Sequence, residues 1–203
     1  MQCKKDDIRG AILKGARKEF LKKGFRNASM RDIAAASCTG TGNIYNYFSG
    51  KDEIFRLLAA PAVESIDFML EEHHGRQGKD ILEMNSKAYF SYVVEEYVTM
   101  IVRNRTALEL LLFHAEGSSL ANFREEYADK CTAVFKQYLA RMGELHPGLN
   151  TEISDFSIRL HSIWMFAILE EILRQKIKPK EINQIITEYM TGEIHGWSEL
   201  IKI

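Results

Sequence analysis

Polar and aromatic side chains gather between Gly40 and Lys51, where they could recognise a nucleic acid. If Gly40 or Thr41 begins a helix that ends near Phe48, then Ile44 and Phe48 lie four residues apart and face a core. The residues left facing outward include Gly42, Asn43, Asn46 and Tyr47. Asparagine can pair bidentately with adenine, tyrosine and threonine can bond phosphate oxygens, and glycine lets the backbone approach a duplex. This pattern indicates a surface suited to double-stranded DNA.

A short helix beginning at Ser29 precedes this surface. The Ser29 hydroxyl can cap the helix, and Ile33, Ala34 and Ser37 form a short buried stripe. We expect Gly40 to form the turn between the two helices, because glycine turns at the least conformational cost. Two short helices joined by a tight turn form a helix-turn-helix, whose second helix enters the major groove of DNA. A helix pair packed in a core with no DNA role is the alternative.

The stretch 29–54 resembles the helix-turn-helix of the tetracycline-repressor-like (TetR) family. The residues that carry the resemblance are Ser29, Asp32-Ile33-Ala34, Gly42, Ile44-Tyr45, Tyr47-Phe48 and Lys51-Asp52-Glu53-Ile54. The family usually has Gly-Val-Ser where this chain has Cys38-Thr39-Gly40, and His in place of Tyr47. The resemblance implies DNA contacts from Ser29, Arg31, Thr41, Gly42, Asn43, Tyr45, Asn46, Tyr47 and Lys51.

The helical periodicity of the chain predicts an all-α fold of about nine helices. Residues 1–50 are expected to form a three-helix DNA-binding head, and residues 51–203 a ligand-binding and dimerisation domain made of a helical bundle. The first helix is expected from Asp6 to Lys23, and a long helix from Asp80 to Val102. Pro61 is expected to kink or break the helix that starts at Lys51. The predicted core of the head consists of Ile12, Ala16, Phe20, Phe25, Ile33, Ile44 and Phe48.

Charge is unevenly distributed along the chain. Residues 1–60 carry twelve Lys and Arg and six Asp and Glu, whereas the remainder carries fifteen basic and twenty-two acidic residues. A basic lobe joined to an acidic one is typical of a phosphate-binding head on a body that does not bind DNA. Differently solvated faces would give the same composition, so the coincidence with the helix-turn-helix gives the asymmetry its weight.

Several function classes lack support in the sequence. Cys3, Cys38 and Cys131 are far apart and odd in number, and adjacent His73 and His74 point to different faces. We therefore expect no disulfide framework, no metal site and no cofactor. With no apolar signal region and no apolar run long enough to span a membrane, the protein is expected to be soluble and cytoplasmic.

The second part of the chain is predicted to bind an effector and a second copy of itself. In the TetR family the last two helices form a four-helix dimer interface, although burial within a monomer would also explain their composition. A small, apolar or aromatic effector could contact Tyr89, Tyr92, Phe113, His114, Phe135, His161, Trp164 and Met165. Plain core packing is the alternative for each of these residues.

The resemblance implies a ligand-responsive repressor that binds a near-palindromic operator as a homodimer and is released by its effector. The alternative is a small all-α enzyme or carrier that uses the aromatic lobe. Against this alternative, neighbouring carboxylates such as Glu95 and Glu96 point apart on their helices, and no nucleophile–base set is evident. The chain is therefore not expected to be an enzyme.

Overall fold

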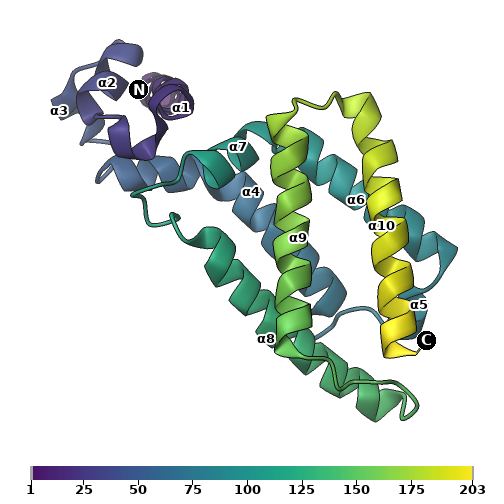
Figure 1. Ribbon diagram of the computed structural model, residues 1–203. Coiled ribbons are helices and arrows are strands. Elements are labelled where there is room, and N and C mark those ends of the chain that lie inside the picture. The colour runs from purple at the N-terminus through teal and green to yellow at the C-terminus, as the bar shows by residue number, and fades with distance from the viewer. Residues whose placement is uncertain (1, 203) are drawn as a thin grey trace. The chain divides into compact units, whose positions relative to one another are not determined.

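The computed structural model describes residues 2–202, and the side chains of residues 2–6, including Cys3 and Asp6, lie outside the description. Within these limits the chain forms ten α-helices and no strand (Figure 1). They are α1 (Gln2–Asn27), α2 (Met30–Ala36), α3 (Thr41–Ile44), α4 (Lys51–His74), α5 (Ile81–Met84), α6 (Lys87–Arg103), α7 (Arg105–Phe113), α8 (Phe123–Leu145), α9 (Asp155–Arg174) and α10 (Pro179–Ile201). The predicted all-α fold is confirmed, with one helix more than expected.

The additional helix arises because the helix expected from Asp80 to Val102 is divided. The Asp80 carboxylate accepts a hydrogen bond from the backbone N–H of Leu82 and caps α5. After α5 ends, the Ser86 hydroxyl accepts from the backbone N–H of Tyr89 and caps α6. The N–H groups in the first turn of a helix have no partner within the helix. A side chain that accepts from one of them favours the start of a new helix over the continuation of the preceding one.

By contrast, Pro61 does not break α4, which continues through this residue to His74, and the alternative of a kink at Pro61 stays a prediction. Pro61 lacks only one backbone donor, and the remaining hydrogen bonds of a long, well-packed helix hold the segment together.

The chain divides into two compact units. The first unit comprises the chain up to Glu64 together with Thr106–Phe123, and the second comprises Ser65–Arg105 and the chain from Arg124 onward. The boundary therefore falls inside α4. The functional boundary expected at residue 50 stays a prediction.

The core of the first unit consists of apolar side chains from α1, α2, α3 and α4. All seven residues predicted for the core of the head are buried: Ile12, Ala16, Phe20, Phe25, Ile33, Ile44 and Phe48. Phe55 adds a third ring to Phe20 and Phe25, with both ring centroids 5.2 Å from its own. Edge-to-face aromatic pairs of this kind stabilise a core beyond the area that they bury.

Thr106–Phe123 is attached to the first unit by specific hydrogen bonds. The backbone N–H of Phe25 donates to the carbonyl oxygen of His114 at 2.9 Å. The Asp52 carboxylate accepts from both the backbone N–H and the hydroxyl of Ser119, each at 2.8 Å. This segment, far along the chain, is therefore part of the scaffold that holds α1 and the start of α4.

The second unit is a bundle of the C-terminal part of α4 with α5, α6, α8, α9 and α10 (Figure 1). Tyr127 on α8 donates its hydroxyl to the Ile66 carbonyl on α4 at 2.8 Å, and its ring packs edge-on against Phe166 on α9. None of the helices in the part of the chain that the structure describes is long and apolar enough to cross a membrane.

Candidate functional site

The turn between α2 and α3 is built by hydrogen bonds that the sequence encodes locally. The Ser29 hydroxyl accepts from the backbone N–H of Asp32, and the Asp32 carboxylate accepts from the backbone N–H of Ser29 at 2.9 Å. This reciprocal capping box fixes the start of α2. Lys23 on α1 pairs with the Asp32 carboxylate at 2.8 Å. Hydrogen bonds from Lys23 and Ser29 hold the pKa of Asp32 well below its usual range.

The residue that reverses the chain after α2 is Cys38 and not Gly40, contrary to the expectation from the sequence. Cys38 has a φ of 52°, whereas Gly40 has an extended backbone and is the N-cap of α3. The positive φ falls at this point because α2 ends at Ala36 with Ser37 as its C-cap, and the residue after the C-cap commonly takes a left-handed conformation. A cysteine at such a position carries a steric cost that glycine avoids.

The second helix of the pair presents a polar surface to solvent. Ile44 and Phe48 are buried, as predicted, while Gly42, Tyr45 and Asn46 are exposed. Regular helix ends at Ile44, but backbone hydrogen bonds to its carbonyl oxygen continue the turns to Phe48. Thr41, Asn43 and Tyr47 are half-exposed, and Ser29 and Arg31 are exposed at the start of α2.

Two asparagines on this surface are linked to each other. The Asn43 amide donates to the Thr39 hydroxyl at 2.9 Å and accepts from the Asn46 amide at 3.2 Å. Asn46 retains its amide oxygen and one N–H facing solvent, which is the donor–acceptor pair that matches the major-groove edge of adenine.

Lys51 is held by backbone groups. Its ammonium donates to the carbonyl oxygens of Phe25 and Ala28 at 2.7 and 2.8 Å and lies 4.2 Å from the centre of the Phe25 ring. Partial burial lowers the pKa of Lys51. Two of the three ammonium protons are thus used inside the first unit, and one remains for a phosphate.

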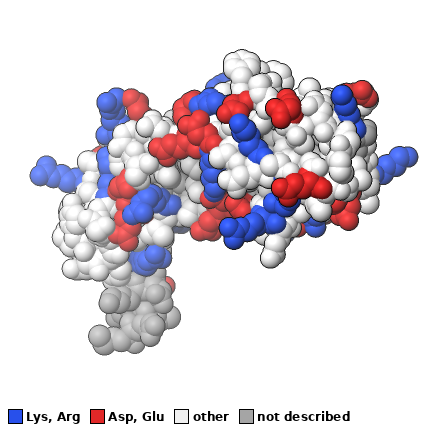
Figure 2. Space-filling view, turned by 90° about the horizontal axis from the view of Figure 1, so that it is seen from below, with Lys and Arg blue, Asp and Glu red and all other residues white. Residues whose placement is uncertain are grey.

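Several basic groups of the first unit are already paired with acids. Besides Lys23, Arg56 pairs with Asp52 at 3.2 Å, and Arg26 pairs with Glu116 at 2.5 Å. Figure 2 shows blue and red side chains interspersed over the viewed face. A basic composition alone therefore does not define the DNA surface, and the geometry of α2 and α3 is the stronger indication.

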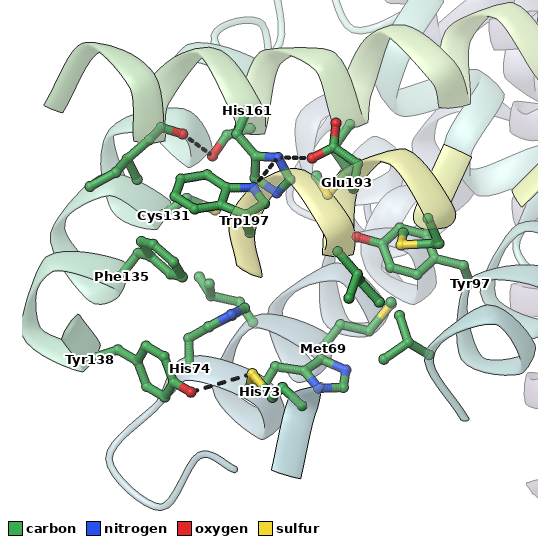
Figure 3. A pocket seen from close by; sticks show the side chains of 18 of the residues that line it. Met69, His73, His74, Tyr97, Cys131, Phe135, Tyr138, His161, Glu193 and Trp197 are labelled. Atoms are coloured by element: carbon green, nitrogen blue, oxygen red, sulfur yellow. Dashed lines mark hydrogen bonds and ion pairs between the residues drawn. The ribbon is translucent and has the colours of Figure 1, made fainter. Parts of the chain in front are cut away.

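The second unit contains a cavity of about 200 Å³. Its wall is mainly apolar and aromatic, with side chains from α4, α5, α6, α8, α9 and α10. Figure 3 shows Trp197 and His161 on one side of this space, Tyr138 and His74 on another, and Phe135 between Trp197 and these two residues. Small-molecule sites are typically concave, largely apolar and supplied with a few polar groups.

Two histidines in the cavity wall are bonded to carboxylates. His73 Nε2 lies 2.6 Å from a Glu96 oxygen, while its Nδ1 accepts from the Tyr89 hydroxyl at 2.7 Å. His161 Nδ1 lies 2.5 Å from a Glu193 oxygen. Within the described residues, no three His, Cys, Asp or Glu side chains are placed to hold a metal ion.

The cavity contains half of the effector residues expected from the sequence. Tyr89, Phe135, His161 and Met165 line it. Tyr92 and Trp164 are largely exposed on α6 and α9, and Phe113 and His114 belong to the first unit. Sequence reasoning missed His74, Tyr97, Tyr138, Glu193 and Trp197, which also line the cavity. The helical spacing of aromatic residues could have suggested Tyr138 and Trp197, whereas the role of Glu193 depends on its partner on another helix.

The fold and the exposed α3 surface together define a helix-turn-helix protein of the DNA-binding class. In agreement, residues 12–58 match the family described as bacterial regulatory proteins, tetR family. A search of curated proteins finds no significant match.

Solved structures match the chain over most of its length. The TetR-family transcriptional regulator PfmR from Thermus thermophilus is 20% identical, with 91% of this chain and 94% of that chain covered and a TM-score of 0.61. NalD, the secondary repressor of the MexAB-OprM multidrug efflux pump in Pseudomonas aeruginosa, is also 20% identical, with 92% and 96% covered and a TM-score of 0.59. FadR from Bacillus subtilis in complex with stearoyl-CoA is 14% identical, with 90% and 97% covered and a TM-score of 0.53.

Residues 12–58 therefore match the model of the tetR-family DNA-binding domain, and the whole chain has the fold of solved TetR-family regulators. The members of this family are transcriptional regulators and not enzymes, in agreement with the expectation from the sequence.

Proposed function

We propose that the chain is a ligand-responsive repressor that binds a near-palindromic operator as a homodimer and is released by a small effector. The observation that carries this proposal is the exposed polar surface of α3. The capping box fixes α2 before it, and buried Ile44 and Phe48 anchor the segment to the core. A protein acting on bacterial DNA would work in the cytoplasm.

The proposed DNA contacts are divided between base reading and phosphate binding. Asn46 is proposed to read a base, with Asn43 positioning it through their hydrogen bond. Tyr45 and Gly42 approach the duplex, and Lys51 offers its remaining N–H to a phosphate. The other proposed contacts come from Ser29, Arg31, Thr41 and Tyr47.

The proposed dimer interface lies on α9 and α10. Phe156 and Trp164 on α9 are 75% and 52% exposed, which leaves two large apolar side chains in contact with water. A two-fold symmetric dimer would bury them and would present two α3 surfaces to the two halves of an operator. The cavity of the second unit is the proposed effector site, and the structure of FadR with stearoyl-CoA supports the proposal that this fold accepts a ligand.

Fluorescence anisotropy with labelled duplexes tiled across the DNA flanking the gene tests the proposal. We expect tight binding to one near-palindromic tile in the presence of scrambled competitor DNA. Asn46→Ala and Asn43→Ala should weaken this specific binding, whereas Lys51→Ala should weaken binding to every duplex and reduce the salt slope by about 0.9. Lys87→Ala, which replaces an exposed lysine at the start of α6, is the matched control and should leave the slope unchanged.

The dimer is tested separately by analytical ultracentrifugation. Trp164→Glu should convert the dimer to a monomer and abolish operator binding, because a buried unpaired carboxylate is costly. Uniformly weak binding that salt abolishes, or a parent protein that is monomeric at operator-binding concentrations, would contradict the proposal.

A further inference from the structure

The described part of the cavity wall in the second unit holds histidines but no lysine or arginine. Among the described residues that line it, none is a lysine or an arginine, and Glu193 is the one carboxylate. An anionic ligand would therefore lose its hydration without gaining an opposite charge, which is strongly unfavourable in an apolar site. This composition argues against a carboxylate or a phosphate inside the cavity.

The polar cluster around His161 leaves one donor without an acceptor. His161 Nδ1 is approached by the Glu193 carboxylate at 2.5 Å and by the Trp197 indole nitrogen at 3.2 Å (Figure 3). A ring nitrogen carries either a proton or a lone pair, so Nδ1 cannot both donate to Glu193 and accept from Trp197. The contact with the Glu193 carboxylate is the shorter one, and a carboxylate oxygen this close to a ring nitrogen requires a proton between them. The proton is therefore assigned to Nδ1, which donates to Glu193. The Trp197 N–H, which points at His161 Nδ1, then finds no lone pair there and is left without an acceptor, although Trp197 lines the cavity.

His74 supplies a second unused donor. No hydrogen bond joins either of its ring nitrogens to another residue in the part of the chain that the structure describes, although the residue lines the cavity. Burial, together with nearby His73, His161 and Arg141, lowers the pKa of His74 to about 3. His74 is therefore a neutral imidazole at physiological pH, with one N–H and one lone pair.

One aromatic ring connects the two donors. The Phe135 ring centroid lies 4.9 Å from that of His74 and 5.1 Å from that of Trp197. The rings of His74 and Trp197 therefore both pack on Phe135, and a small molecule lying beside Phe135 would be close to both rings. The cavity volume of about 200 Å³ is below the usual range for drug-sized ligands, so the molecule that fits is small.

We infer that the effector is a small, uncharged apolar molecule with an oxygen acceptor, such as an alcohol, a carbonyl or an ether, bound by Trp197 and His74. A cation is disfavoured because the carboxylates of Glu193 and Glu96 already have imidazole partners. This inference rests on the proposed function, since it names the chemical class of the effector proposed for the same cavity.

Isothermal titration calorimetry of the full chain with octan-1-ol, octanoate and octylammonium tests the inference, because these probes share a chain and differ in the charge of the head group. We expect octan-1-ol to bind at least about tenfold more tightly than either ion, since an unpaired buried charge costs more than a neutral hydroxyl. The measurement contains no DNA, so its result is independent of operator binding.

Two variants test the assigned donors. His74→Phe and Trp197→Phe keep an aromatic ring but remove the N–H, and each should weaken octan-1-ol binding by about fivefold. Met165→Leu, which changes the cavity wall without removing a hydrogen bond, is the matched control and should bind as the parent does. Circular dichroism confirms that each variant is folded before titration.

Tighter binding of octanoate or octylammonium than of octan-1-ol would overturn the inferred class, and so would the absence of heat from all three probes. Unchanged octan-1-ol affinity in both folded donor variants would overturn the assignment of Trp197 and His74. None of these results would change the outcome of the operator-binding experiment, so the failure of the inference can be distinguished from the failure of the proposed function.

Discussion

Replacing Gly15 with alanine should separate α1 from α2, because backbone atoms occupy the space that the new methyl group would need. A Cβ at Gly15 would lie 2.9 Å from the Ser37 backbone nitrogen and 3.0 Å from the carbonyl carbon of Ala36. Backbone atoms at the end of a helix cannot move aside as a flexible side chain can. The whole of α2 would have to shift by a few tenths of an ångström.

The expected free-energy change is the sum of two opposing effects. Alanine in a helix interior is favoured over glycine by about 1 kcal/mol. Overpacking a tight contact typically costs about 1–3 kcal/mol. Gly10, on the exposed side of the same helix, isolates the first effect, because a Cβ there would meet nothing within 4 Å. We therefore expect Gly10→Ala to stabilise the protein by up to about 1 kcal/mol, and Gly15→Ala to be about 1–3 kcal/mol less stable than Gly10→Ala.

Urea unfolding followed by circular dichroism measures both variants. Because α2 carries the turn that leads to α3, Gly15→Ala should also weaken operator binding, whereas Gly10→Ala should leave it unchanged. If the two variants were equally stabilised, the close approach of α1 and α2 would not constrain the packing of the first unit, and this reasoning would be refuted.

Three further predictions concern single side chains. Cys38→Gly should stabilise the protein by about 1 kcal/mol in urea unfolding, because glycine adopts a positive φ without strain; a loss of stability would contradict the strain at this turn. Asp32→Asn should lower the melting temperature at neutral pH. Since the pKa of Asp32 is held down in the folded state by Lys23 above all, its contribution is complete above the unfolded pKa and is lost as pH falls through the folded pKa, so parent and variant should converge in acid. Tyr189→Phe should be neutral or stabilising, because the Tyr189 hydroxyl is buried without a partner among the described residues, whereas Tyr127→Phe should cost about 1 kcal/mol; equal effects in thermal melts would refute this distinction.

The sequence is most informative where contacts are local. The four-residue spacing of Ile12, Ala16 and Phe20 is enough to identify the inner face of α1, and the capping residue Ser29 is enough to start α2. Apolar residues at helical spacing lie on one face of the helix, and that face packs against the core. The apolar pattern in the sequence therefore identifies the buried residues. The turn is different, because the position of the positive φ depends on where α2 ends and not on where a glycine occurs.

The cavity shows the limit of sequence reasoning. His114 and His161 both place a polar group in an apolar pattern, but only His161 lines the cavity. His114 belongs to a segment whose backbone bonds to Phe25, more than eighty residues earlier, and nothing local reports that pairing. Likewise, the unused donor of Trp197 follows from the presence of Glu193 and His161 on two different helices. Such long-range constraints are invisible to periodicity.

The chain passes between the two units within α4, at Arg105–Thr106 and at Phe123–Arg124. The same helix α4 supplies Phe55 to the core of the first unit and His74 to the cavity wall.

An effector can change operator affinity only if it binds one arrangement of the units more tightly than the other. Thermodynamic linkage then requires the effect to be reciprocal, so octan-1-ol should weaken operator binding by the same factor by which the operator weakens octan-1-ol binding. Anisotropy with saturating octan-1-ol and calorimetry with saturating operator measure the two factors. We expect the two factors by which each ligand weakens the binding of the other to be equal and greater than one, and both should decrease in His74→Phe. A factor of one in both directions would show that the cavity does not control DNA binding.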